Sequence, residues 1–264
     1  MGAMHHGRFL WFDLMTTDTG AARDFYAKVV GWTLTRWDGD GPDGDGHYEM
    51  FTSPTGPIGG SMTLPTEARE MGAPTHWLGY IGAEDVDATV AEAVALGAKI
   101  YAPTMSMAEV GRFAVLADPW GAVFGVYTPS GVTEDGGRPK TPAMGHMSWF
   151  ELMTGDVDAA FDFYAKLFGW VKTDAMDMGE HGIYQMFGPA PGETIGGMMK
   201  LHGEQMPPCW GYYARVPDLD AALETVKAAG GTVLNGPMEV PGGDRVAQAL
   251  DPQGGYFALH AVKG

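Results

Sequence analysis

The chain has 264 residues, of which 45% are hydrophobic and 19% are charged, the composition of a globular protein with buried cores. A formal net charge of −17 disfavours nucleic-acid and membrane partners and favours a cationic ligand, although solubility alone would explain the charge. A single cysteine, Cys209, excludes an internal disulfide, and neither a signal peptide nor a membrane-spanning run is recognisable. We therefore expect a cytoplasmic protein.

The first quarter of the chain predicts the order strand, helix, strand, strand, strand. Residues 9–15 form a short aromatic and apolar run that is typical of a buried strand. Apolar residues at helical spacing then predict a helix over 19–30, with an inner face made of Ala22, Phe25, Tyr26 and Val29. Three further strands are expected at 32–37, 47–52 and 58–64.

The same order returns after a loop expected at 65–74. A strand is predicted at 77–83, followed by a helix that begins after Asp85 and ends at Gly97. The predicted inner face of this helix consists of Val86, Val90, Ala93 and Val94. Further strands are expected at 98–102, 111–117 and 122–127, with the turn Asp118-Pro119-Trp120-Gly121 between the last two.

The second half of the chain repeats the first. Trp149 matches Trp11 at an offset of 138 (149 − 11 = 138), and Trp210 matches Trp77 at an offset of 133 (210 − 77 = 133). A repeat of this length that occurs twice indicates a duplicated domain. The predicted organisation is a first domain over 1–129, with modules at about 8–64 and 75–128, a linker at 130–143, and a second domain over 144–264, with modules at about 146–201 and 209–262.

Two recurring motifs accompany these modules. Phe-Tyr-x-x-x-x-Gly-Trp follows the first strand of each half, and Asp-Pro-x-Gly precedes the last strand. With these motifs the chain resembles, over nearly its whole length, the vicinal oxygen chelate superfamily, which includes glyoxalase I, bleomycin-resistance proteins and extradiol dioxygenases. Its form is that of the double-domain glyoxalase-like proteins. The resemblance implies an α+β fold in which four βαβββ modules form two glyoxalase-like domains with cupped mixed sheets.

The resemblance also implies where a divalent metal would be held, and the chain departs from that pattern. The ligand histidine of the family stands seven residues before the Asp that opens the helix, and Trp11 and Trp149 occupy this position here. The partner glutamate stands four residues after the Gly of Asp-Pro-x-Gly, where this chain has Gly125 and Ala258. We therefore expect no metal cofactor.

Side chains of other kinds are expected to line each cup. Because side chains alternate along a strand, Asp13 shares its face with Trp11 and Met15, and the same holds for Glu151 in the second half. Asp13 and Glu151 could act as a catalytic base or as the counter-charge of a ligand cation, or they could be held in ion pairs by Arg112 and Arg245. The expected ligand-binding residues are Trp11, Met15, Trp77, Tyr80, Arg112, Tyr127, Trp149, Met153, Trp210, Tyr213, Arg245 and His260.

Three functions stay open at this point. The first is metal-independent binding of a small aromatic or cationic organic molecule in a cup lined by Trp and Met. The second is a metal-dependent lyase, isomerase or dioxygenase of the same superfamily, with a divalent metal held by Glu151 and His260. The third is a metal-free hydroxylase or isomerase that uses Asp13 or Glu151 as its base. The duplication is compatible with either a monomer or a homodimer.

Overall fold

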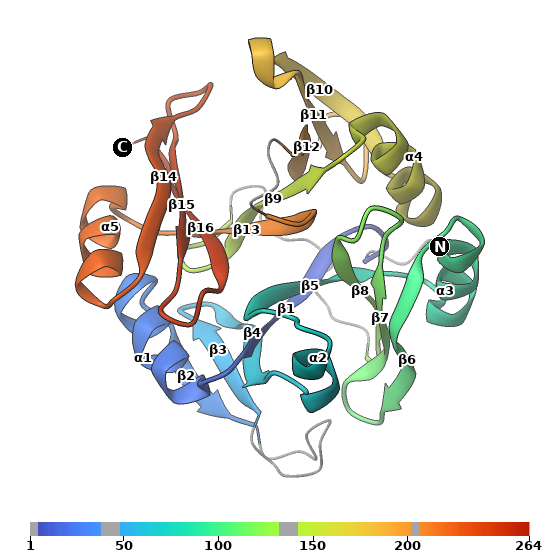
Figure 1. The fold of residues 1–264 in the computed structure, drawn as a ribbon, viewed down its shortest axis with the longest axis horizontal. Coiled ribbons are helices and arrows are strands. Elements are labelled where there is room, and N and C mark those ends of the chain that lie inside the picture. Colours follow the sequence, from blue (N-terminus) through green and yellow to red (C-terminus); the bar gives the residue numbers. More distant parts are fainter. Residues whose placement is uncertain (1–4, 38–47, 132–141, 202–205, 264) are drawn as a thin grey trace. The chain divides into compact units, whose positions relative to one another are not determined.

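The computed structural model describes residues 5–37, 48–131, 142–201 and 206–263. Within these ranges the chain forms two eight-stranded mixed sheets, one from each half of the sequence (Figure 1). Neither sheet closes into a barrel. The predicted α+β fold with four strand-helix-strand-strand-strand modules is confirmed.

In the first sheet the strands follow the order β2 (Thr33–Arg36), β3 (Glu49–Ser53), β4 (Gly56–Thr63), β1 (Phe9–Thr16), β5 (His76–Gly82), β8 (Val123–Pro129), β7 (Gly111–Ala117) and β6 (Lys99–Met107). In the second sheet the order is β10 (Val171–Asp177), β11 (Ile183–Gly188), β12 (Gly196–Lys200), β9 (Met147–Thr154), β13 (Cys209–Arg215), β16 (Tyr256–Ala261), β15 (Arg245–Leu250) and β14 (Thr232–Glu239). Within each module the first and last strands run parallel, and the remaining neighbours are antiparallel.

Each module carries one main helix after its first strand. These helices are α1 (Thr19–Val29), α3 (Val86–Ala95), α4 (Val157–Phe168) and α5 (Leu219–Ala228). An aspartate caps each of them, and its carboxylate accepts a hydrogen bond from the backbone N–H three residues later; the caps are Asp18, Asp85, Asp156 and Asp218. Among the described helices none is long and apolar enough to cross a bilayer.

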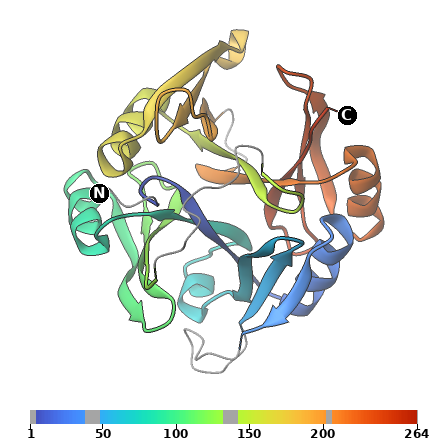
Figure 2. The same cartoon turned by 180° about the vertical axis from the view of Figure 1, so that it is seen from behind.

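Contacts between residues group the chain into two compact units that do not follow the two halves. The first unit comprises Met1–Trp11, Leu78–Arg138 and Trp149–Gly211, and the second comprises Phe12–Trp77, Pro139–Ser148 and Tyr212–Gly264. Each unit therefore takes one module from each half. Helices α3 and α4 pack together in the first unit, and α1 packs beside α5 in the second, where both views show them (Figures 1 and 2). The domain boundaries at 129 and 144 stay a prediction.

An aromatic core holds the second unit together. The Tyr26 hydroxyl, fully buried on α1, donates to Asp251 Oδ2 at 3.0 Å and accepts from Trp77 Nε1 at 2.9 Å. Trp32 packs against the Tyr26 ring at 5.6 Å, and its indole N–H donates to the Gly145 carbonyl at 2.7 Å. The Tyr and Trp of the first sequence motif are thus structural residues, because each finds partners for its polar group inside the core: Tyr26 bonds to Asp251 and Trp77, and Trp32 to the Gly145 carbonyl.

The first unit contains the same core built from the matching residues. Tyr164 on α4 donates to Asp118 Oδ2 at 3.0 Å and accepts from Trp210 Nε1 at 3.0 Å. The other carboxylate oxygen of Asp118 accepts three backbone N–H groups of its own turn, so the Asp-Pro-x-Gly motif links a β-turn to the helix of another module. Burial raises the pKa of Asp118 and of its counterpart Asp251, although these hydrogen bonds oppose the increase.

Three details differ from the sequence predictions. Val94 is 44% exposed instead of buried, because it lies at the border of the apolar stripe of α3, and Thr89 on the other border is buried. The loop expected at 65–74 contains a short helix, α2 (Thr66–Glu70), and β6 continues five residues beyond the predicted end at 102. Most of the predicted linker, 132–141, lies outside the described residues.

Candidate functional site

A buried carboxylate in the first unit is the centre of the candidate site. Glu151 lies on β9 opposite Gly197 of β12 and is 5% exposed. The Tyr184 hydroxyl donates to Glu151 Oε1 at 2.9 Å and accepts from Trp149 Nε1 at 2.8 Å. These three residues form a chain of hydrogen bonds that we call the acidic-aromatic cluster. It holds the carboxylate in one orientation and places it beside an indole ring that is partly exposed.

Glycine makes this arrangement possible. A Cβ atom at Gly197 would lie 2.0 Å from Tyr184 Cε1, so the phenol ring lies flat over the strand only because the glycine has no side chain. Glu151 and Trp149 share one strand face, since they are two residues apart on β9, and Phe150 and Leu152 occupy the opposite face. The site therefore follows directly from the strand register.

The second unit contains a related pair. Asp13 on β1 lies opposite Gly60 of β4, is 7% exposed, and accepts a 2.5 Å hydrogen bond from the Tyr48 hydroxyl. A Cβ atom at Gly60 would lie 2.2 Å from Tyr48 Cζ, which repeats the glycine requirement of the first unit. Trp37 contacts the Tyr48 ring edge-on at 6.1 Å. The duplicated carboxylates thus have duplicated tyrosine partners.

The cluster offers defined chemistry to a ligand. A carboxylate fixed by a phenol can accept hydrogen bonds from a ligand or neutralise a ligand cation, and an indole can stack on a planar ring. Met153, two residues beyond Glu151 on the same strand face, adds a polarisable thioether and is 7% exposed; Met15 is its counterpart in the first half. Burial, with the nearby negative charge of Glu151, raises the pKa of the Cys209 thiol to about 12, which keeps this thiol protonated.

Two of the predicted ligand-binding tryptophans lie elsewhere. Trp77 and Trp210 are 5% and 4% exposed and donate their indole N–H groups to buried tyrosines, as described for the two cores. Trp11 lies two residues before Asp13 on β1 and is partly exposed, as Trp149 is beside Glu151. The structure therefore brings Trp149, but not Trp210, to the acidic-aromatic cluster.

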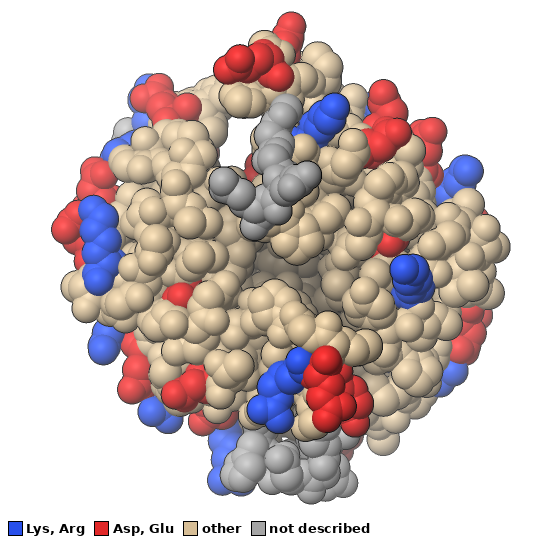
Figure 3. Space-filling view, viewed as in Figure 1, with Lys and Arg blue, Asp and Glu red and all other residues tan. Residues whose placement is uncertain are grey.

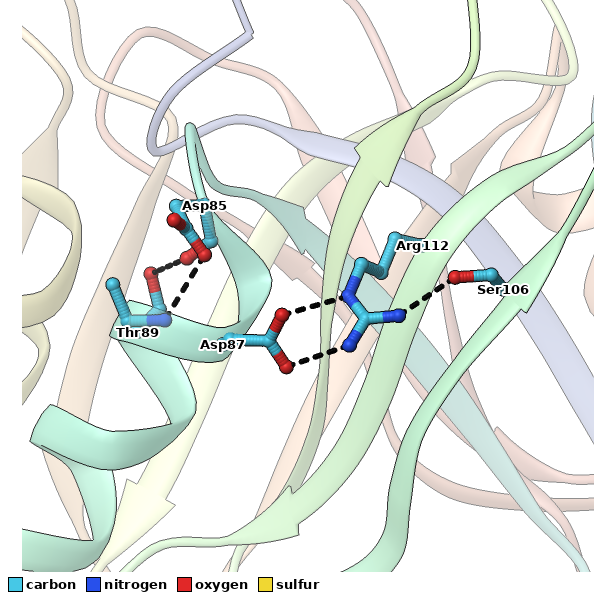
Figure 4. Close-up of polar contacts among 6 residues, drawn as sticks. Asp85, Asp87, Thr89, Ser106 and Arg112 are labelled. Atoms are coloured by element: carbon cyan, nitrogen blue, oxygen red, sulfur yellow. Dashed lines mark hydrogen bonds and ion pairs between the residues drawn. The ribbon is translucent and has the colours of Figure 1, made fainter.

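The two predicted arginines are engaged on the surface of their own modules. Arg112 on β7 forms a bidentate pair with Asp87 on α3, at 2.8 and 2.9 Å, and its third nitrogen donates to Ser106 (Figure 4). Arg245 also forms a bidentate pair, with Asp220, through its Nη1 and Nη2 atoms at 2.8 and 3.0 Å. The alternative in which these arginines hold Asp13 and Glu151 in ion pairs is wrong, because each forms its ion pair at the start of the nearest helix. Hydrogen bonds from Arg112 lower the pKa of Asp87.

Three predicted aromatic residues, Tyr80, Tyr127 and Tyr213, lie in the second module of each half. Tyr80 lies over Gly125, where a Cβ atom would be 2.2 Å from the Tyr80 ring, and it contacts the Tyr127 ring at 6.4 Å. The Tyr127 hydroxyl donates to the Val110 carbonyl at 2.8 Å. Tyr213 accepts a hydrogen bond from the side chain of Gln248 at 3.0 Å. The position where the family resemblance implies a glutamate ligand, Gly125, thus has no room for a side chain.

The side chains that are present do not suit a divalent metal. In the described ranges no three His, Cys, Asp or Glu side chains gather into a group able to hold one. Glu151 is hydrogen-bonded to Tyr184, and His260 is hydrogen-bonded to Ser148 and Asp244. Both residues that the sequence offered as alternative metal ligands therefore have other partners. The chemistry of this donor set disagrees with the metal sites that the fold implies.

Sequence reasoning identified the carboxylates and missed their partners. Tyr48 and Tyr184 recur at an offset of 136 (184 − 48 = 136), and each faces the second glycine of a Gly-Gly pair, at Gly60 and Gly197. An unusual glycine pair in a buried strand, with a tyrosine on the neighbouring strand, is the signal that could have found them. On the face shown in Figure 3, Lys and Arg side chains are separated from one another by uncharged or acidic ones.

Comparison with known proteins supports one family. The family model "Glyoxalase/Bleomycin resistance protein/Dioxygenase superfamily" matches residues 8–126 and 145–259. "Putative glyoxylase CFP32" of Mycobacterium tuberculosis is 32% identical, over 94% of this chain and 92% of the relative. The anthracycline biosynthesis protein DnrV of Streptomyces peucetius is 31% identical, over 94% of this chain and 91% of the relative.

Solved structures of two enzymes share the fold. The Mn(II)-bound glyoxalase from Novosphingobium aromaticivorans has a TM-score of 0.63 and 15% identity, and the match covers 99% of this chain and 83% of the other. The dioxygenase LapB from Pseudomonas sp. KL28 has a TM-score of 0.65 and 13% identity, and the match covers 99% and 94% of the two chains. The chain therefore belongs to the glyoxalase, bleomycin-resistance and dioxygenase superfamily, as a protein with two copies of the glyoxalase domain.

Proposed function

We propose that this protein binds a small, planar organic molecule at the acidic-aromatic cluster, without a metal ion. The observation that carries the proposal is the buried Glu151 carboxylate held by Tyr184 beside the partly exposed Trp149 ring. The Asp13 and Tyr48 pair is a second, related site in the other unit. The same pairing of a buried carboxylate with a tyrosine in both halves supports the proposal, because a carboxylate held in one orientation can accept a further hydrogen bond from a ligand or neutralise a ligand cation.

The chemical class of the ligand follows from the three side chains. The carboxylate favours a protonated amine or a hydroxyl donor, the indole favours a flat aromatic ring, and the net charge of −17 favours a cation. Two relatives are named anthracycline biosynthesis proteins, which makes planar aromatic compounds the first ligands to test. We also propose the cytoplasm as the location and either a monomer or a homodimer as the assembly.

Catalysis by the carboxylate is the second candidate. A base has to be held near its substrate, and the hydrogen bond from Tyr184 gives Glu151 a fixed orientation. This supports a metal-free hydroxylase or isomerase in which Glu151, or Asp13 in the other half, removes a proton. A metal-dependent lyase or dioxygenase is the third candidate; it has the support of the fold and lacks a matching donor set among the described residues.

Ligand titration of one variant and one control tests the proposal. Proflavine, a planar aromatic cation, should quench tryptophan fluorescence and raise the melting temperature of the wild type. Glu151→Gln keeps the size of the side chain and removes its charge, so we expect the Kd to rise at least ~10-fold, which corresponds to about 1.4 kcal/mol. Glu180→Gln is the matched control, because the Glu180 side chain is 89% exposed.

Two results would contradict the proposal. The first is an equal Kd for proflavine in the wild type and in Glu151→Gln. The second is a stoichiometric divalent metal found by elemental analysis of protein purified without chelator, which would favour the metal-dependent candidate. Turnover of a bound ligand that disappears in Glu151→Gln would instead favour the metal-free enzyme.

A further inference from the structure

A serine, a histidine and an aspartate form a second constellation, separate from the acidic-aromatic cluster. Ser148 on β9 and His260 on β16 both belong to the second unit, and Ser148 Oγ lies 2.8 Å from His260 Nδ1. On the other side of the ring, His260 Nε2 lies 3.0 Å from Asp244 Oδ2. A nucleophile, a base and an orienting carboxylate in hydrogen-bond contact are the arrangement of nucleophilic catalysis.

The carboxylate determines which nitrogen of His260 carries the proton. Asp244 Oδ1 accepts a hydrogen bond from the backbone N–H of Lys263 at 3.0 Å, and this bond is the largest of the effects that lower the pKa of Asp244. The ionised carboxylate can only accept hydrogen bonds, so Nε2 of the histidine carries the hydrogen. In the neutral ring, Nδ1 then carries no hydrogen, and its lone pair can accept a hydrogen bond from the Ser148 hydroxyl.

The serine proton has two acceptors. Ser148 Oγ also lies 3.0 Å from the Tyr213 carbonyl oxygen, to which it can donate. Rotation about the Cβ–Oγ bond moves the proton between this carbonyl and His260 Nδ1, and such a rotation is fast in proteins. The serine therefore needs no movement of the backbone to come under the control of the base.

An arginine supplies a positive charge at the same place. Arg215 on β13 is the register partner of His260 on β16, so the two side chains lie next to each other on one face of the sheet. Its guanidinium donates through Nη1 to the Pro142 carbonyl, whereas its buried Nε–H has no hydrogen-bond partner among the described residues. A buried donor without an acceptor is rare, and it is suited to an oxygen that develops negative charge.

We propose that Ser148, His260, Asp244 and Arg215 form a nucleophilic serine site for small carboxylic esters. Ser148 Oγ attacks the ester carbonyl carbon while His260 Nδ1 takes its proton, and the carbonyl oxygen becomes negative beside Arg215. The tetrahedral adduct collapses, the C–O bond to the alcohol breaks, and the leaving alkoxide takes the proton from His260. Water then attacks the acyl-serine with the same base and releases the carboxylic acid.

The first half of the chain provides an internal control. The positions that correspond to the four residues are Leu10 (148 − 138), Tyr127 (260 − 133), Gly111 (244 − 133) and Gly82 (215 − 133). None of these four residues is a serine, histidine, aspartate or arginine, so the first half lacks this constellation. The two halves therefore differ at this place, and reaction is expected at one serine in each chain.

A fluorophosphonate probe on the full-length protein tests the site. The serine oxygen forms a P–O bond, fluoride leaves, and the serine proton passes through His260 to water. We expect one adduct per chain by intact mass, located on Ser148 by peptide mapping, and hydrolysis of p-nitrophenyl acetate by the same protein. Ser148→Ala should abolish both reactions, and His260→Gln should slow both at least ~100-fold. Ser106→Ala is the control, because Ser106 also contacts an arginine but lies on the exposed β6 to β7 surface.

The outcome decides the proposal in either direction. An absent adduct in folded wild-type protein, an adduct on another serine, or labelling that is unchanged in His260→Gln would overturn it. Circular dichroism and thermal unfolding establish that each variant is folded, and if Ser148→Ala does not fold, the mapped adduct and His260→Gln decide alone. Arg215→Lys removes the Nε–H and keeps the charge, and should slow ester hydrolysis at least ~10-fold.

Discussion

Replacing Tyr184 with phenylalanine measures how strongly the acidic-aromatic cluster is held. The substitution removes one hydroxyl and two hydrogen bonds, from Trp149 Nε1 at 2.8 Å and to Glu151 Oε1 at 2.9 Å. A neutral hydrogen bond contributes about 1 kcal/mol and a bond to a charged group about 1.5–3 kcal/mol. Because Glu151 and Tyr184 are 5% and 8% exposed, water replaces these bonds poorly. We expect the free energy of unfolding to fall by about 3 kcal/mol.

Urea denaturation followed by tryptophan fluorescence is the assay, with Tyr101→Phe as the matched control. Tyr101 is 55% exposed, so the same change of atoms should alter its free energy of unfolding by less than ~0.5 kcal/mol. Tyr184→Phe should also weaken proflavine binding, since the carboxylate loses its fixed orientation. An equal effect of the two substitutions, or a loss below ~1 kcal/mol for Tyr184→Phe, would refute the reasoning.

Three further outcomes are expected. Gly197→Ala should displace the Tyr184 ring, because the new Cβ atom would lie 2.0 Å from Cε1. Urea denaturation should then show a lower free energy of unfolding and titration a higher Kd for proflavine, and an unchanged Kd would contradict this prediction. The pKa of Cys209 is about 12 instead of the ordinary 9.0, so its alkylation by iodoacetamide should be ~1,000-fold slower than that of a free thiol. Glu151→Gln removes a negative charge that raises this pKa and should accelerate the alkylation, with the rate followed by mass spectrometry. The pKa of Asp118 is higher in the folded protein than its ordinary value of 3.8, so the protonated carboxyl stabilises the fold. This contribution to the free energy of unfolding is complete below pH 3.8 and is lost as the pH rises through the pKa of the folded state. Urea denaturation between pH ~4 and ~7 should show the loss in the wild type and not in Asp118→Asn.

Local sequence patterns were sufficient for most of the fold. The helical spacing of Ala22, Phe25, Tyr26 and Val29 marks the buried face of α1 as predicted, because a 3.6-residue period requires no knowledge of distant residues. The helix start after Asp85 was found for the same reason, since a cap acts on the N–H three residues away. Val94 and the short α2 were missed, because the border of an apolar stripe and a five-residue helix are decided by neighbours in space.

The candidate site was only partly accessible from the sequence. Strand alternation correctly grouped Glu151 with Trp149 on one strand face, which is local information. The partner Tyr184 lies 33 residues beyond Glu151, and its role depends on the register between β11 and β12 and on the glycine beneath the ring. The sequence predicted Trp77 and Trp210 to bind the ligand. In the structure their indole N–H groups donate hydrogen bonds to buried tyrosines, so both residues belong to the cores.

The sequence by itself determined the duplication, the four modules and the acidic residue of each half, because repeats and strand alternation are written in local order. Only the tertiary structure decided which polar groups meet. Ser148, His260 and Asp244 come from three different strands or turns, and hydrogen bonds of 2.8 and 3.0 Å join them. Such contacts depend on the register between strands that are distant in the sequence. A shift of one residue in this register would turn each side chain to the other face of the sheet, and local sequence order does not determine the register.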